Sequence, residues 1–141
     1  MQRDYILRLI EEAGAILRSA LAEILDRRTK RPAILSQLKQ ATQLGNLDLD
    51  LLRVLDANTV RGIVTQGWSD PARTWLAAEA LYLDGLSERT EEGPGAGTQS
   101  LTKALMLFRM IGPAGGVPAG FPEAAERVRE IEALLSDELP S

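Results

Sequence analysis

The sequence contains no cysteine and no histidine, and only six of its 141 residues are aromatic. Without cysteine, the chain has no disulfide, no thiol nucleophile and no zinc–thiolate site. Without histidine, it has no Ser-His-Asp triad and no side chain that ordinarily titrates near neutral pH. Any catalysis would therefore depend on carboxylates, lysine, tyrosine or the backbone.

Long apolar runs are also missing, since none approaches the roughly 18 residues that a membrane span needs. The N-terminus reaches Glu11-Glu12 before an apolar leader segment forms. The net charge is −4: residues 1–40 carry eight basic and five acidic side chains, and residues 41–141 carry eight and fifteen. An acidic body repels phosphate backbones. We therefore expect a cytoplasmic protein without a membrane partner, for which a nucleic-acid partner is disfavoured.

What the sequence has in abundance is leucine and alanine, with 23 and 18 copies, whereas valine, isoleucine, threonine and aromatic residues are sparse. This balance favours helices over strands. The fractions of hydrophobic (45%) and charged (26%) residues are ordinary for a globular protein. We expect one all-α domain over residues 1–141, a helical bundle of five main helices and two short ones.

The longest predicted helix covers residues 4–26. Its apolar stripe includes Ile6, Ile10, Leu17 and Ile24 at helical spacing. So wide a stripe must pack against the rest of the chain or against a second copy. We predict that these four residues contribute to self-association, with a dimer favoured.

Shorter helices are expected in the leucine-rich region 32–67 and in region 70–138. Asn58 is the expected N-cap of one short helix, and Asp70-Pro71 is a clear start signal for a helix reaching about Arg89. The glycine-rich stretches 91–97 and 112–120 are expected to be linkers, because a phosphate-binding loop needs a preceding strand and a Gly-Lys-Ser/Thr end. The predicted helices of both regions are 32–44, 49–55, 59–66, 71–89, 98–111 and 122–135.

The C-terminal half carries a repeat-like pattern. Its aromatic, alanine and proline residues resemble, in type and order, the signature of a tetratricopeptide repeat, at Trp75, Tyr82, Ala104, Phe108 and Pro113. The segment between Tyr82 and Ala104 is about thirteen residues longer than that repeat allows. The resemblance therefore implies a lengthened, degenerate helical hairpin within residues 70–135.

Two further motifs resemble a family of small bacterial helical proteins of unknown function. They are Asp4-Tyr5-Ile6-x-Arg8-x-Ile10-Glu11 and Leu47-Asp48-x-Asp50-x-Leu52. The resemblance implies an opening helix, a leucine-rich middle and a repeat-like C-terminal hairpin. It implies no activity.

Acidic pairs are the remaining catalytic candidates. Glu23/Asp26 and Glu88/Glu91 resemble the pairs with which all-α nucleotide pyrophosphohydrolases hold Mg²⁺. Such a site needs several carboxylates that converge from facing helices. Here the order of the two pairs is wrong, and Glu88 and Glu91 are expected at a helix end beside a glycine-rich loop, so surface acids are the favoured interpretation. We predict no catalytic residue, no metal site and no cofactor.

Other polar residues allow two interpretations each. Glu79, among alanines and leucines, forms a structural pair with an arginine or a tyrosine hydroxyl, or else faces a groove. The basic segment 27–31, with Arg27, Arg28, Lys30 and Arg31, is a solvated connector or contacts nucleic acid or anionic lipid. The connector and the structural pair are the favoured interpretations.

The helix at residues 101–111 is apolar on nearly every side, so it lies at the centre of a bundle or exposes a binding face. We predict a partner-binding groove at Trp75, Glu79, Tyr82, Met106 and Met110. The favoured function is a non-enzymatic helical protein–protein interaction module that self-associates and binds an unknown protein partner. The alternative is an all-α metal-dependent nucleotide hydrolase using Glu and Asp ligands, and a nucleic-acid adaptor working through residues 27–31 ranks third.

Overall fold

Seven helices, and no strand, form the parts of the chain that the computed structural model describes, which are residues 2–66, 71–111 and 117–136. The all-α bundle with five main helices and two short ones is confirmed. The helices are α1 (Gln2–Asp26), α2 (Arg31–Leu44), α3 (Leu49–Val54), α4 (Ala57–Thr65), α5 (Pro71–Glu92), α6 (Thr98–Met110) and α7 (Ala124–Ser136).

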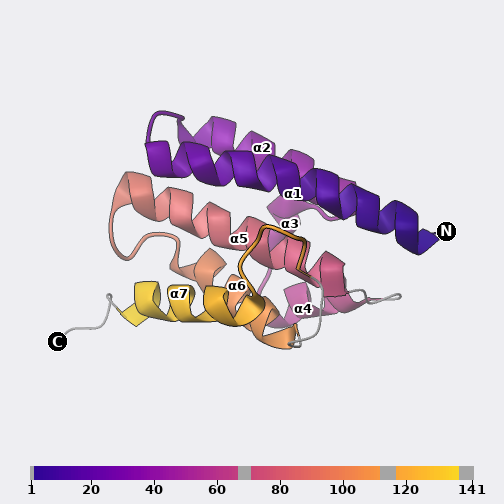
Figure 1. The fold of residues 1–141 in the computed structure, drawn as a ribbon. Coiled ribbons are helices and arrows are strands. Elements are labelled where there is room, and N and C mark those ends of the chain that lie inside the picture. Colours follow the sequence, from indigo (N-terminus) through magenta and orange to yellow (C-terminus); the bar gives the residue numbers. More distant parts are fainter. Residues whose placement is uncertain (1, 67–70, 112–116, 137–141) are drawn as a thin grey trace.

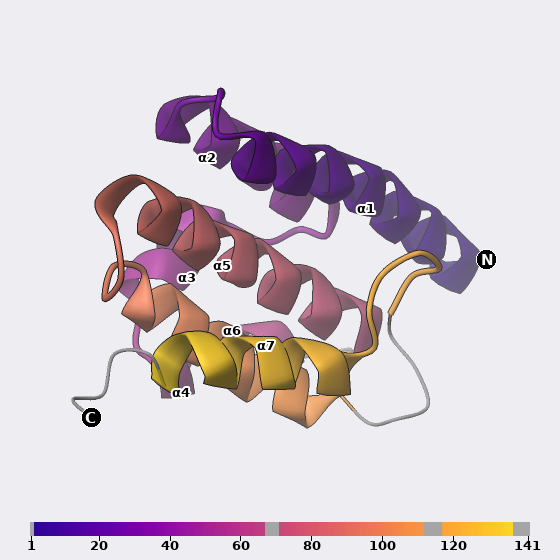
Figure 2. The ribbon, with the colours of Figure 1, turned by 60° about the vertical axis from the view of Figure 1, so that its left-hand side comes forward.

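Helix α5 lies at the centre of the bundle. The α1–α2 pair covers one side of it, the α6–α7 pair covers the opposite side, and the short helices α3 and α4 close a third side (Figures 1 and 2). Nearly every residue from Ala72 to Gly85 is buried, as a helix packed on several sides requires. None of the helices in the described ranges is long and apolar enough to cross a bilayer.

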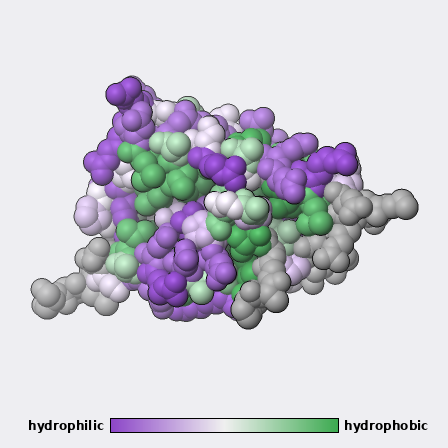
Figure 3. Space-filling view, viewed as in Figure 1, coloured by the Kyte–Doolittle hydropathy of each residue, from purple (hydrophilic) through white to green (hydrophobic). Residues whose placement is uncertain are grey.

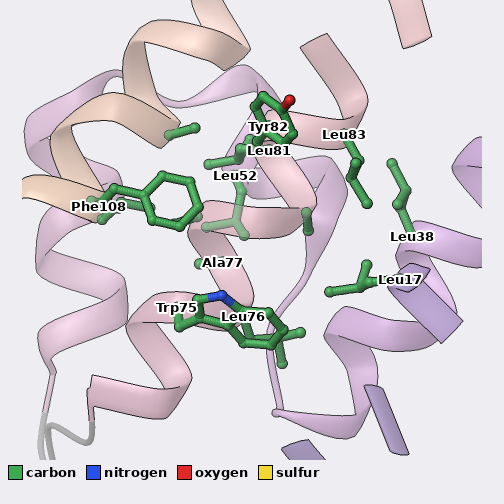
Figure 4. Packing of buried hydrophobic residues seen from close by; sticks show 14 of the residues in the cluster. Leu17, Leu38, Leu52, Trp75, Leu76, Ala77, Leu81, Tyr82, Leu83 and Phe108 are labelled. Atoms are coloured by element: carbon green, nitrogen blue, oxygen red, sulfur yellow. The ribbon is translucent and has the colours of Figure 1, made fainter. Parts of the chain in front are cut away.

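The hydrophobic core is built around α5. Leu17 and Leu38, from α1 and α2, lie on one side of this helix, and Phe108 of α6 lies on the other (Figure 4). Burying each such side chain contributes about 1.5–3 kcal/mol. The apolar stripe of α1 is therefore used within its own chain.

The hairpin of α5 and α6 depends on two glycines. Gly97 has a left-handed backbone (φ +76°), and a Cβ atom there would lie 2.3 Å from the carbonyl oxygen of Gly85. A Cβ atom at Gly85 would lie 2.7 Å from Cγ of Leu101. The stretch 91–97, predicted only as a linker, thus also provides the contact that lets the two helices approach closely.

Several helix ends differ from the prediction. The N-cap of α4 is Asp56 instead of Asn58, because the Asp56 side chain accepts a hydrogen bond from the Thr59 N–H at 2.7 Å. Helix α5 continues past Arg89 to Glu92, and α7 begins at Ala124. The predicted cap at Asp70 lies outside the described residues.

Candidate functional site

Three of the five predicted partner-binding residues lie inside the core. Trp75, Glu79 and Tyr82 follow one face of α5, and all three are buried. The ring of Phe121 packs edge-on against Trp75, with 4.8 Å between the centroids. Helix α7 covers the other two through Arg127. A partner helix would have to displace α7 to reach these side chains, so the predicted groove is occupied by the chain itself.

Glu79 forms a structural ion pair, as the favoured interpretation predicted. The Arg127 guanidinium donates from Nε to one carboxylate oxygen at 2.9 Å and from Nη2 to the other at 2.8 Å. It also donates to Glu130 at 2.7 Å. A two-pronged contact of this kind is the strongest geometry that arginine and carboxylate adopt. The idea that Glu79 faces a groove is wrong.

The electrostatics of this network follow from its burial. Burial raises the pKa of Glu79, and the hydrogen bond from Arg127 opposes that rise. Burial also raises the pKa of Tyr82 to about 12. Burial alone would lower the pKa of Arg127, but the hydrogen bonds and negative charge of Glu79 outweigh it and leave the pKa raised. The Arg127 guanidinium lies 4.4 Å from the centre of the Tyr82 ring, and the Tyr82 hydroxyl donates to Glu130 at 3.2 Å.

Met106 and Met110 lie elsewhere. Met106 is half-buried against the core, and Met110 is exposed near the end of α6. Between them Arg109 pairs with Glu132 of α7 at 2.7 Å. The structure does not bring the five predicted residues onto one surface.

The residues predicted to mediate self-association are also internal. Ile10, Leu17 and Ile24 are buried in the core of their own chain, because α1 packs on α2 and α5. The side chain of Ile6 lies outside the described residues. A second copy can reach only the opposite face of α1, and this corrects the residue assignment without testing self-association itself.

A second buried acid, Asp84, was missed by the sequence interpretation. Its carboxylate accepts from Arg31 at 2.8 Å, from Arg53 at 3.1 Å and from the Ser100 hydroxyl at 2.6 Å. Asp84 thus joins α5 to α2, α3 and α6. A signal was present, because Asp84 directly follows Leu83 in the same apolar helix that carries Glu79 among alanines.

Lys103 is buried beside this network. Its ammonium donates to the backbone carbonyls of Leu52 and Arg53, at 2.9 and 2.7 Å, at the C-terminal end of α3. Burial lowers the pKa of Lys103, and the charge of Asp84 opposes that change. Arg31, Arg53 and Lys103 therefore have structural roles, and Arg31 ties one end of the basic connector to the core.

The acidic pairs do not converge on a common point. Glu23 accepts hydrogen bonds from Thr29 and Gln37, and Glu88 lies 3.6 Å from the Arg31 guanidinium. Among the residues that the structure describes, no three acids are close enough to hold a metal ion.

An open groove lies beside the N-terminal part of α1. Apolar side chains line its walls, and its volume is about 460 Å³. Arg73 lies along it and donates to the carbonyls of Gly45 and Asn46, both at 3.1 Å, and of Ile63, at 3.3 Å. These bonds satisfy carbonyls at the ends of α2 and α4, so the groove exposes mainly apolar surface. Its lining residues are Leu9, Ile10, Leu44, Gly45, Asn46, Ile63, Gln66 and Arg73.

Tyr5 lies on α1 about one turn before the groove-lining Leu9. It lies four residues before Leu9, hence on the same side of α1, and its side chain is exposed. The first turns of α1 reach past the beginning of α5 (Figures 1 and 2). The lining residues given above, together with the neighbouring exposed Tyr5, are called the apolar groove.

No protein-family model, no curated protein and no solved structure matches the chain.

Proposed function

We propose that this chain is a non-enzymatic helical protein–protein interaction module that self-associates and binds a partner protein in the apolar groove. The observation that carries the proposal is the groove itself. Its walls come from α1, α2 and α4, and Arg73 engages backbone carbonyls that border it. A concave, mainly apolar surface of this kind suits an apolar anchor of a partner.

An amphipathic helix is the occupant that suits this groove. Helix-in-groove recognition places apolar anchors at i, i+3 or i+4 into a hydrophobic channel. A volume of about 460 Å³ holds two or three apolar side chains. Tyr5 at the rim is a residue type that often contributes strongly to binding energy.

The resemblances of the sequence remain part of the proposal. The close α5–α6 hairpin at Gly85 and Gly97 supports a relation to a lengthened tetratricopeptide-like unit. The order of a long opening helix, short middle helices and a C-terminal hairpin is what the resemblance to the small bacterial helical family implies.

Site-specific photocrosslinking tests the groove. Because the chain has no cysteine, Gln66→Cys carries a benzophenone label in the groove, and Asn58→Cys on the exposed side of α4 is the matched control. We expect adducts with discrete proteins of a cell extract only from the Gln66 position. Tyr5→Asp in the Gln66→Cys background should abolish them while the melting temperature stays unchanged, because Tyr5 is exposed. Equal labelling from both positions would refute the groove.

The alternative, a metal-dependent nucleotide hydrolase, is tested by titration with Mg²⁺ and Mn²⁺. We expect neither ion to raise the melting temperature and no phosphate to be released from nucleoside triphosphates. A rise in melting temperature that depends on Glu88 or Glu91 would favour the alternative, since binding to the folded state stabilises it.

A further inference from the structure

The outer face of α1 is exposed along most of the helix. One edge of this face carries Leu7, Glu11, Arg18 and Leu25, which lie within about 40° of one another around the helix at 100° per residue. Leu7 is 39% exposed and Leu25 is 68% exposed, so both offer apolar surface at the two ends of this edge. Figure 3 shows an apolar area over the C-terminal end of α1 and the neighbouring part of α5.

The order of residues along this edge is self-complementary. Measured from Ala15 at 1.5 Å per residue, Glu11 lies about 6 Å towards the N-terminus and Arg18 about 4.5 Å towards the C-terminus. Leu7 lies about 12 Å and Leu25 about 15 Å from the same point. If a second helix runs antiparallel across Ala15, acid meets base and leucine meets leucine on both halves.

A two-fold axis preserves this match. In an isologous dimer the same patch is used twice, and an edge of one helix faces the same edge of the other. Both Glu11–Arg18 contacts then form together, and so do both leucine contacts. Ala15 and Ala22, which are exposed between the two ends, let the helices approach closely.

Arg18 is oriented by contacts within its own chain. Its guanidinium donates to the Ala119 carbonyl at 3.2 Å and lies 4.8 Å from the centre of the Phe121 ring. Only part of its donor capacity is used there, because a guanidinium has five N–H donors. The side chain is exposed and oriented before any partner arrives.

We propose that two copies of this chain pair antiparallel through the outer face of α1, with Ala15 at the two-fold axis. Glu11 then lies opposite Arg18 of the partner subunit, and Leu7 lies opposite Leu25 of the partner subunit. This inference rests on the proposed self-association and assigns it a surface. The apolar groove stays free on a different side of α1.

Cysteine crosslinking tests the geometry. In Ala15→Cys the two thiols meet at the axis, within the 4.4–6.8 Å between Cα atoms that a disulfide spans. Ala125→Cys, on the exposed side of α7, is the matched control. We expect mild oxidation to convert Ala15→Cys to a disulfide dimer and to leave Ala125→Cys largely monomeric.

Sedimentation of the unmodified chain distinguishes failure of the α1 interface from failure of self-association. A dimer in solution together with equal crosslinking of both variants would refute the α1 interface and leave self-association standing. A monomer at all concentrations would refute self-association as well, whereas the partner-binding groove is tested independently by its own photocrosslinks.

A charge swap tests the pairing of Glu11 with Arg18. Glu11→Arg or Arg18→Glu alone places like charges together twice, so we expect the dimer Kd to rise about tenfold. The double variant re-forms both pairs with reversed polarity and should return the Kd to within about threefold of the original value. Glu126→Arg on α7 is the control for the charge change, and circular dichroism verifies folding. A double variant as weak as the single variants would overturn the assignment.

Discussion

Two acids on α5, Glu79 and Asp84, are both buried but are neutralised differently. Glu79 gives both oxygens to one guanidinium, and the side chains of Glu79 and Arg127 are only 1% and 5% exposed. Asp84 is shared between two arginines and a serine. The side chains of Arg31 and Arg53 are 14% and 31% exposed.

The two networks differ in the charge that is left unpaired when one of their residues is replaced. Around Glu79 there is one dry pair, so loss of either member leaves a charge that water reaches poorly. Around Asp84 there are several donors, and the two arginines already touch solvent. Glu79 fastens one helix, α7, to the bundle, whereas Asp84 links three helices to α5. We therefore expect the Glu79 pair to be the more sensitive to a single substitution.

The largest expected effect is that of Arg127→Met. Removal of the guanidinium leaves the Glu79 carboxylate buried without its partner, and breaking a buried pair in this way costs about 3–5 kcal/mol. The free energy of urea unfolding measures the loss. Amide hydrogen exchange should rise first in α7, because Arg127 links this helix to α5 through a buried ion pair.

The pH dependence of this variant has a defined sign. With no arginine to oppose burial, the pKa of Glu79 in the folded state rises further above that in the unfolded state. The folded state then binds the proton more tightly, so the deficit shrinks as pH falls towards about 4 and grows as pH rises. The double variant Glu79→Leu/Arg127→Met removes both charges and should recover most of the stability. A deficit that does not change with pH would contradict this account.

A smaller loss is expected for Asp84→Asn. The amide oxygen still accepts one hydrogen bond, and both arginines can turn towards solvent, so we expect a loss of about 1–3 kcal/mol. Urea unfolding under the same conditions provides the comparison with Arg127→Met. If Asp84→Asn proves the more damaging variant, the number of shared donors does not protect a buried acid in this fold.

Local patterns predicted the helices but not their partners. The apolar spacing around Ile10 and Leu17 depends only on neighbouring residues, so α1 is visible in the sequence. Glu79 is marked as paired because a carboxylate among alanines needs a partner. Its partner Arg127 is 48 residues away, and nothing local distinguishes it from other arginines.

The candidate surfaces were harder to predict for the same reason. The groove combines Leu9, Leu44 and Ile63 from three helices, so no single stretch of sequence contains it. The predicted groove over Trp75 and Tyr82 was assigned from helix faces alone, without knowing that α7 packs across them. Periodicity shows which face is apolar, and packing decides whether that face is covered.

Tyr82 allows a further test of the difference between the Glu79 and Asp84 networks, because of these two only the Glu79 network contains a tyrosine. Burial raises the pKa of Tyr82 from its ordinary value of 10 to about 12. The folded state thus holds the phenol proton more tightly, and the resulting stability is present in full below about pH 10 and is lost as pH rises through 12.

Tyr82→Phe should cost about 1 kcal/mol at neutral pH, for the lost hydrogen bond to Glu130. It should also lose less stability than the parent chain between pH 10 and 12. Tyr5→Phe is the matched control, because Tyr5 is exposed. The other groups that titrate at alkaline pH are present in both variants, so their effects on stability cancel when the two variants are compared. Equal alkaline losses in Tyr82→Phe and Tyr5→Phe would show that burial does not raise the pKa of Tyr82.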